Sequence, residues 1–113
     1  MINSPDPTNL TDIRNLDLVA TVRSGRVLVA GAGVSGRGAI AMLTDIGCPE
    51  VVVVDDSALG ALVAADFLVR HVTTADARDE LADAVAIVTS PGWRPTSPLF
   101  DAAAEAGVPV FGD

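Results

Sequence analysis

Three glycines, Gly31, Gly33 and Gly36, form a G-x-G-x-x-G pattern directly after the apolar run at residues 27–30. This spacing suits the binding of a diphosphate. The first glycine permits a tight turn, the second lets a ligand approach the backbone, and the third lets the next helix pack close to the strand. The unpaired amides of that helix's first turn favour an anion. The sequence therefore predicts an anion-binding turn, although the same glycines would also suit a strand-to-helix corner without a ligand.

Two further polar segments follow apolar runs. Residues 55–57 come directly after the four valines at 51–54, and a Ser-Pro-Gly turn at 90–92 closes another run. In doubly wound sheets, ligands bind beyond the carboxyl ends of the strands. The interval from Gly31 to Asp55 resembles the one at which an acidic residue meets a ribose hydroxyl in NAD enzymes. Asp55 would also suit a solvated strand end or a cap. From these residues alone, NAD and another nucleoside diphosphate fit equally well.

The elements that must position these residues alternate between strands and helices. Such alternation is typical of βαβ units with right-handed crossovers. We therefore predict an α/β fold, a Rossmann-like three-layer domain with a mostly parallel sheet of about five strands. Gly47 and Gly107 are expected to end helices, and the acidic residues at 76–83 to face solvent. The expected strands are 27–30, 51–54, 67–72, 86–89 and 108–111, and the expected helices are 35–46, 59–65, 74–82 and 98–106.

Composition restricts the function. The chain has 113 residues and a formal net charge of −8, and all seven basic residues are arginine. A P-loop lysine is therefore absent, so ATP chemistry is expected outside this chain, and the acidic balance argues against nucleic acid as a partner. No apolar run reaches the ~18 residues of a membrane span. The single cysteine and the lack of an export signal favour the cytoplasm. We expect an N-terminal extension at 1–24 and one domain at 25–113.

The last part of the chain carries a more specific pattern. A strand ending in Ser-Pro-Gly, a proline-bearing turn and a small-residue helix are followed by Gly-Val-Pro-Val-Phe-Gly-Asp at 107–113. This pattern resembles the Mur ligases, and the glycine turn and Asp55 match the same family in the same order. The resemblance covers residues 26–113. Within the family it is strongest to the ligases that join UDP-N-acetylmuramoyl-L-alanine to D-glutamate in peptidoglycan precursor synthesis.

The resemblance implies the first of three domains, the one that holds the UDP-sugar substrate. ATP and Mg²⁺ would belong to a central domain with a P-loop, and D-glutamate to a C-terminal domain. The substrate carboxylate would be activated as an acyl phosphate before the amine attacks. Neither later domain is expected in this chain, so the chain alone would hold no catalytic residue and no metal, and would bind substrate weakly. The parent is expected to be a cytoplasmic monomer.

The resemblance also assigns contacts. The amides of Val34 and Ser35, with the Ser35 hydroxyl, would meet the diphosphate, and Asp55 would accept from a uracil or ribose donor. Some relatives carry Thr-Arg where this chain has Asp56-Ser57, which removes a cation and a stacking surface. The alternatives are an NAD(H)-binding domain of a dehydrogenase or regulatory protein, and an α/β interaction platform without a ligand. The implied substrate-binding residues are Gly33, Val34, Ser35, Gly36, Asp55, Asp56, Ser57 and Gly92.

Overall fold

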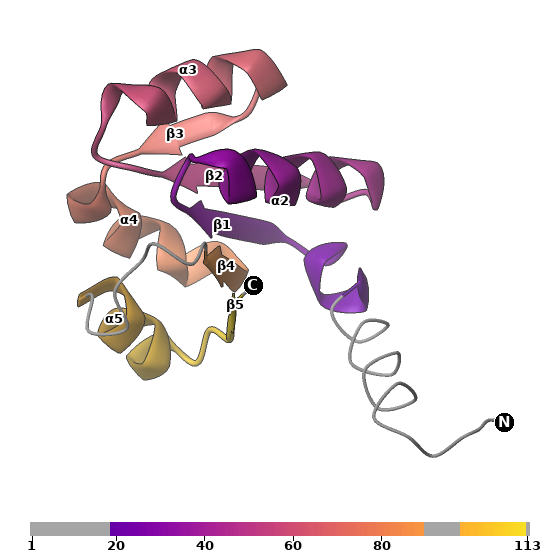
Figure 1. Ribbon diagram of the computed structural model, residues 1–113. Coiled ribbons are helices and arrows are strands. Elements are labelled where there is room, and N and C mark those ends of the chain that lie inside the picture. Colours follow the sequence, from indigo (N-terminus) through magenta and orange to yellow (C-terminus); the bar gives the residue numbers. More distant parts are fainter. Residues whose placement is uncertain (1–18, 90–97, 113) are drawn as a thin grey trace, which may run out of the picture.

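In a computed structural model, which describes residues 19–89 and 98–112, five parallel strands form one sheet with helices on both faces (Figure 1). The strand order is β3-β2-β1-β4-β5. The predicted Rossmann-like α/β fold is confirmed, and every strand pair in the sheet is parallel. The strands are β1 (Arg26–Ala30), β2 (Glu50–Val54), β3 (Arg70–Val72), β4 (Ala84–Thr89) and β5 (Val110–Gly112). The helices are α2 (Val34–Asp45), α3 (Ala58–Phe67), α4 (Thr74–Glu80), the 3₁₀ turn η1 (Leu81–Asp83) and α5 (Pro98–Ala106).

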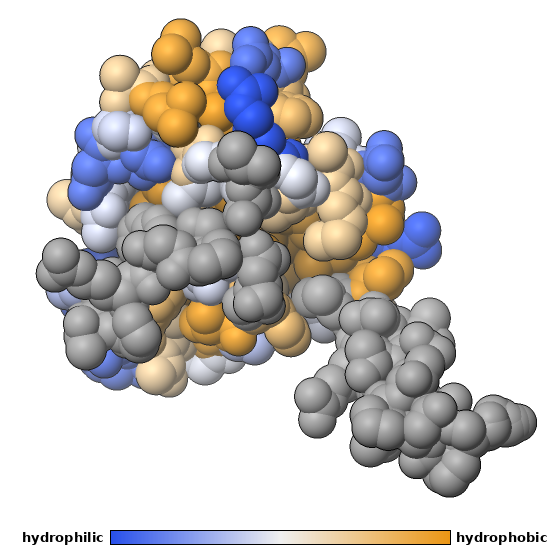
Figure 2. Space-filling model, viewed as in Figure 1, coloured by the Kyte–Doolittle hydropathy of each residue, from blue (hydrophilic) through white to orange (hydrophobic). Residues whose placement is uncertain are grey.

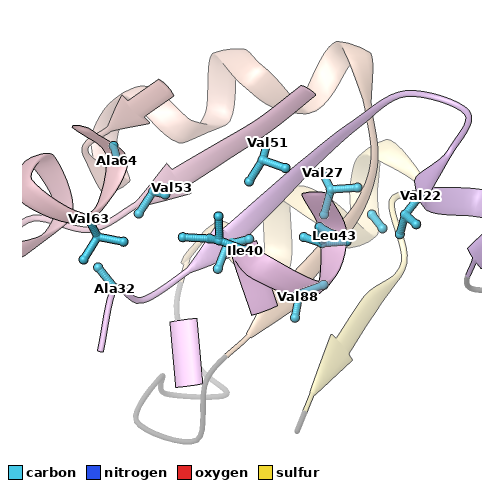
Figure 3. Close-up of a cluster of buried hydrophobic side chains, with 12 residues drawn as sticks. Val22, Val27, Ala32, Ile40, Leu43, Val51, Val53, Val63, Ala64 and Val88 are labelled. Atoms are coloured by element: carbon cyan, nitrogen blue, oxygen red, sulfur yellow. The ribbon is translucent and has the colours of Figure 1, made fainter. Parts of the chain in front are cut away.

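One face of the sheet packs on α2 and α3. Alternate strand residues point to this face, because successive side chains in a strand point in opposite directions. Ile40 and Leu43 of α2 lie among these strand side chains (Figure 3). Val22, within the predicted N-terminal extension, is also fully buried in this cluster. The buried residues of this face are Val22, Val27, Val29, Ala32, Ile40, Leu43, Val51, Val53, Val63, Ala64, Ala86 and Val88.

The opposite face packs on α4, η1 and α5. The intervening strand residues supply this second cluster together with Leu99 and Ala103 of α5. The four valines of β2 are therefore buried on both sides of the sheet, as the continuous apolar run predicts for a central parallel strand. The buried residues of this face are Leu28, Ala30, Val52, Val54, Ala77, Leu81, Ile87, Leu99, Ala103 and Val108.

The start of β3 differs from the expectation. The strand predicted at 67–72 begins only at Arg70, since Phe67 is still helical and Leu68 takes a left-handed conformation, with φ +57°, that ends α3. Two apolar residues that suit a strand by type are thus used in a helix end and a turn. The other predicted boundaries lie within two residues of those observed. Gly47 and Gly107 have φ values of +91° and +74° at helix ends, as expected.

An ion-pair network joins the amino ends of the strands. Arg26 contacts Glu50, Glu80 and Asp83, and Arg70 contacts Glu50 and Glu80. The expectation that the acidic residues at 76–83 all face solvent is wrong for Glu80, whose side chain is only 14% exposed. Hydrogen bonds from Arg70 and Arg26 hold the pKa of the Glu50 carboxyl below its usual value. This network lies at the end of the sheet opposite the glycine turn.

Helix α3 is apolar except for Asp66 near its carboxyl end. Leu59 and Leu62 remain exposed on its outer side, and hydrophobic surface gathers over this helix at the top of Figure 2.

Over the part of the chain that the structure describes, no helix combines the length and the apolar character needed to cross a membrane.

Candidate functional site

The glycine turn lies where the strand order reverses. From β1 the chain passes to β2 and β3 on one side, and then crosses to β4 and β5 on the other. Strand β1 is therefore flanked by β2 and β4, and its carboxyl end opens at the topological switch point, where doubly wound sheets bind ligands. The turn after β1 and the loop after β2 both lie at this edge.

The three motif glycines have separate geometries. Gly31 has a φ of +100°, which L-residues rarely adopt, so it makes the tight turn. A Cβ on Gly36 would overlap the carbonyl oxygen of Gly31, so this glycine permits the close approach of α2 to β1. Gly33 is exposed, and a Cβ there would meet no atom of the described residues within 4 Å. The division of roles predicted from the pattern is confirmed for the turn and for the close packing, and Gly33 leaves open space in front of the helix.

Helix α2 begins at Val34 without a side-chain cap. Gly33 is its N-cap, and within the part of the chain that the structure describes no capping side chain accepts a hydrogen bond there. The first turn also holds no acidic residue. The Arg37 amide bonds the Gly33 carbonyl at 2.9 Å, which starts the helical ladder, so the amides of residues 34–36 precede it and have no helical carbonyl to bind. Their dipoles favour an anion at this position.

Asp55 connects the two segments at the sheet edge. Its Oδ2 accepts from the Ala32 amide at 2.9 Å, and its Oδ1 accepts from the amide and hydroxyl of Ser57 at 2.7 and 2.6 Å. Partial burial raises the pKa of the Asp55 carboxyl, but the hydrogen bonds from Ser57 and Ala32 outweigh it, and the pKa lies below its usual value. The carboxylate is therefore ionised at neutral pH. Each carboxylate oxygen accepts about two hydrogen bonds, and among the described residues only the Ala32 amide donates to Oδ2, which leaves room there for one more donor.

The carboxylate of Asp56 accepts two hydrogen bonds from Thr74. Its Oδ1 accepts from the Thr74 amide at 2.7 Å and its Oδ2 from the Thr74 hydroxyl at 2.9 Å. These bonds tie the loop after β2 to the start of α4. The structure thus brings Asp55 and Ser57 to the glycine turn, while the carboxylate of Asp56 is directed to Thr74.

His71 belongs to the same edge, although its sequence context gave no sign of a role. Its Nε2 lies 2.7 Å from the carbonyl oxygen of Asp55. Parallel pairing of β2 with β3 sets His71 opposite Val53, two residues before Asp55. Only the strand register, which an isolated histidine does not reveal, brings the ring to this carbonyl.

The remaining predicted residues are only partly described. The main chain of Val34 and Ser35 opens α2, but the Ser35 hydroxyl and the turn at 90–92, with Gly92, lie outside the described part of the structure. Among the described residues, no group of three or more His, Cys, Asp or Glu side chains is arranged to hold a metal ion.

The fold and this edge define a class of protein, a Rossmann-like α/β domain with a glycine-rich turn between the first strand of its sheet and the following helix. In sequence, the chain is 47% identical over 102 residues to the UDP-N-acetylmuramoylalanine–D-glutamate ligase of Corynebacterium jeikeium (strain K411), covering 86% of this chain and 20% of that protein. It is 44% identical over 96 residues to the ligase of the same name from Rhodococcus jostii (strain RHA1), covering 81% and 19%. The chain belongs to the UDP-N-acetylmuramoylalanine–D-glutamate ligase family, as an N-terminal segment. It spans about a fifth of the length of these curated relatives.

No family model matches the chain. Among solved structures, it is similar to glutamyl-tRNA reductase from Methanopyrus kandleri, with a TM-score of 0.64, 24% identity, and coverage of 83% of this chain and 24% of that one. It is also similar to quinate dehydrogenase from Corynebacterium glutamicum in complex with NAD, with a TM-score of 0.61, 18% identity, and coverage of 87% and 48%. At these identities the likeness shows the fold alone.

Proposed function

We propose that this chain holds the UDP-sugar substrate of a cytoplasmic ligase that joins UDP-N-acetylmuramoyl-L-alanine to D-glutamate. The family membership supports the substrate, since the relatives carry it in their names. The open glycine turn supports the way in which it binds. The diphosphate lies at the start of α2, and the uridine lies over the loop at 55–57.

The observation that carries this proposal is the N-terminus of α2, which no side chain of the described residues caps and where none of them lies within 4 Å of a Cβ built on Gly33. The amides at 34–36 supply donors, and the helix dipole supplies a positive potential without a basic side chain. A diphosphate would satisfy these donors. The remaining acceptor position on Asp55 Oδ2 would take one N–H or O–H of the uridine.

In this proposal the chain binds and orients the substrate, and the chemistry takes place elsewhere. ATP and Mg²⁺ are assigned to a central domain and D-glutamate to a C-terminal domain of the parent ligase. The absence of lysine from this chain agrees with that division, because a P-loop needs one. The isolated chain is therefore expected to bind substrate without converting it.

The rival ligand is NAD(H), because the same fold occurs in the NAD complex of quinate dehydrogenase. Both ligands carry a diphosphate, so the glycine turn alone does not separate them. The two proposals differ in which nucleotide shifts the amides of the turn and of the loop after β2.

The test is a titration of the 113-residue chain, followed by amide NMR, with UDP-N-acetylmuramoyl-L-alanine and in a parallel series with NADH. We expect shifts at residues 33–36 and 55–57 with the UDP compound at millimolar concentration. Gly33→Ala should weaken binding about tenfold, because a methyl group in front of the amides removes charge-assisted hydrogen bonds. Gly38→Ala is the matched control, since it adds a methyl to the same helix, where a Cβ likewise meets nothing within 4 Å.

The outcomes separate the ligands. Shifts with NADH alone would contradict the proposal and would identify NAD(H) as the ligand of this turn. No shift with either nucleotide would leave the family relationship intact but would contradict binding by this turn. Equal weakening by Gly33→Ala and Gly38→Ala would place the ligand away from the helix terminus.

A further inference from the structure

The ring of His71 contacts the main chain of Asp55, beside the glycine turn where we place the proposed ligand. Its Nε2 lies 2.7 Å from the Asp55 carbonyl oxygen, and the contact is partly buried. A carbonyl oxygen only accepts hydrogen bonds, so Nε2 must carry the proton and donate. The histidine is thereby fixed in the Nε2–H form, or is doubly protonated.

The hydrogen bond from His71 holds the carbonyl group of Asp55, and the carboxylate of the same residue contacts the glycine turn. The Asp55 amide donates to the Val72 carbonyl at 3.2 Å, and the Asp55 carboxylate accepts from Ala32 and Ser57. With the His71 contact, the amide, carbonyl and carboxylate of Asp55 are all engaged. The main-chain bonds hold the backbone of Asp55, and the bonds from Ala32 and Ser57 direct its side chain toward the turn.

The packing around this contact leaves no room for a side chain at position 60. Gly60, in the first turn of α3, is buried against both residues. A Cβ on Gly60 would lie 2.7 Å from the Asp55 Cβ and 2.7 Å from the His71 Nε2. Glycine at this position, which is unfavourable inside a helix, allows the histidine ring to reach the strand end.

We infer that His71 is a positioning residue for the proposed substrate site, acting through the main chain of Asp55. The inference rests on the proposed function, because it concerns the same site at the glycine turn and the loop at 55–57. The ring fixes the end of β2 so that the Asp55 carboxylate holds the Ala32 amide and keeps one acceptor position open for the uridine. His71 itself does not touch the ligand.

The test compares His71→Gln with His71→Met in the 113-residue chain. The two side chains have similar length and no charge, but only glutamine can donate from the position of Nε2. We expect His71→Gln to bind UDP-N-acetylmuramoyl-L-alanine within about twofold of the unchanged chain, and His71→Met to bind about threefold to tenfold more weakly, the range of one hydrogen bond. Without ligand, the Ala32 amide resonance should move in His71→Met and stay in place in His71→Gln.

Gly60→Ala provides a second, independent variant, since it forces the same contact apart while the histidine remains. It should also shift the Ala32 amide and weaken binding. Equal affinities and equal Ala32 shifts in the glutamine and methionine variants would overturn the inference. If the unchanged chain does not bind the UDP compound, the proposed function and this inference fall together. If the unchanged chain binds and His71→Met binds equally well, only the inference falls.

Discussion

The carboxylate of Asp55 bonds the main-chain amide of Ala32 at the carboxyl edge of the sheet, with Oδ2 2.9 Å from the nitrogen. The two residues end neighbouring strands, β2 and β1, and are 23 positions apart in the chain. The contact holds the glycine turn against the loop at 55–57. The geometry of the proposed ligand site therefore depends on a single carboxylate that also serves the fold.

Replacing this carboxylate should weaken the fold. Asp55→Asn places an amide nitrogen where one of the donors, from Ala32 or Ser57, now finds an oxygen. We expect the free energy of unfolding at pH 7 to fall by about 1–2 kcal/mol, the lower part of the range for hydrogen bonds to charged groups, because the carboxylate is only partly buried. Urea denaturation measures the change. Asp66→Asn, which removes an exposed ion pair to Arg37, is the control and should change stability by less than about 0.5 kcal/mol.

The same carboxylate should make stability depend on acid. The pKa of Asp55 is lower in the folded chain than its usual value. Its contribution is therefore fully present above the unfolded-state pKa of about 4 and is lost as the pH falls through the folded-state pKa. The difference in stability between the unchanged chain and Asp55→Asn should shrink below about pH 4. A difference of constant size in urea denaturation from neutral pH to about pH 2 would contradict this assignment.

The third motif glycine, Gly36, should not tolerate a side chain. Gly36→Ala drives a methyl group into the Gly31 carbonyl. Because both partners are backbone, we expect a loss of about 1–3 kcal/mol in the free energy of unfolding. Gly38→Ala, on the same helix with open space around it, should instead raise stability by about 0.5–1 kcal/mol. Thermal unfolding of both variants tests the contrast, and similar melting temperatures would refute it.

Leu68 is placed at a helix end that suits glycine. It is 93% exposed and has a φ of +57°, so the side chain gains nothing from burial while the backbone is strained. Leu68→Gly should raise the free energy of unfolding by about 1 kcal/mol. Leu62→Gly makes the same change at an exposed position inside α3, 63% accessible, and should lower stability by about 1 kcal/mol. Chemical denaturation should show opposite signs for the two variants.

The ion-pair network at the amino ends of the strands should stabilise the fold, chiefly through Glu80. This carboxylate accepts two hydrogen bonds from Arg70, at 2.9 and 3.0 Å, and lies 3.2 Å from Arg26. Glu80→Gln should lower stability by about 1–2 kcal/mol at low salt, and less at high salt because charges are screened. Asp79→Asn, at an exposed position on the same helix, should change it by less than about 0.5 kcal/mol. Equal effects measured by urea denaturation would show that the network does not stabilise the fold.

Local patterns predicted the parts of this chain that local rules govern. The valines of β2, the glycine turn after β1 and the glycines that follow α2 and α5 all express their structure within a few residues, and they were confirmed. The start of β3 was wrong because Leu68 adopts a conformation that its residue type disfavours. Tertiary contacts decide that position, and no local signal marks it.

The contacts of the site side chains could not be predicted from local sequence patterns. Asp55 and His71 stand on different strands, and only the register of β2 against β3 brings the ring to the carbonyl. Asp56 was predicted to contact the ligand, yet its carboxylate bonds Thr74, 18 positions away. Glu80 was expected to face solvent for the same reason, because its arginine partners lie on β1 and β3. Pairings of this kind depend on topology rather than on spacing.

The two outer strands of the sheet are its shortest, with three residues each in β3 and β5. Each leaves one row of backbone groups open to another chain. Pro109, directly before β5, lacks an amide hydrogen and limits any lengthening of that strand. A foreign strand would find too few positions to form a stable ladder. The short outer strands thus limit the growth of the sheet into aggregates, even though its central strands are rich in valine.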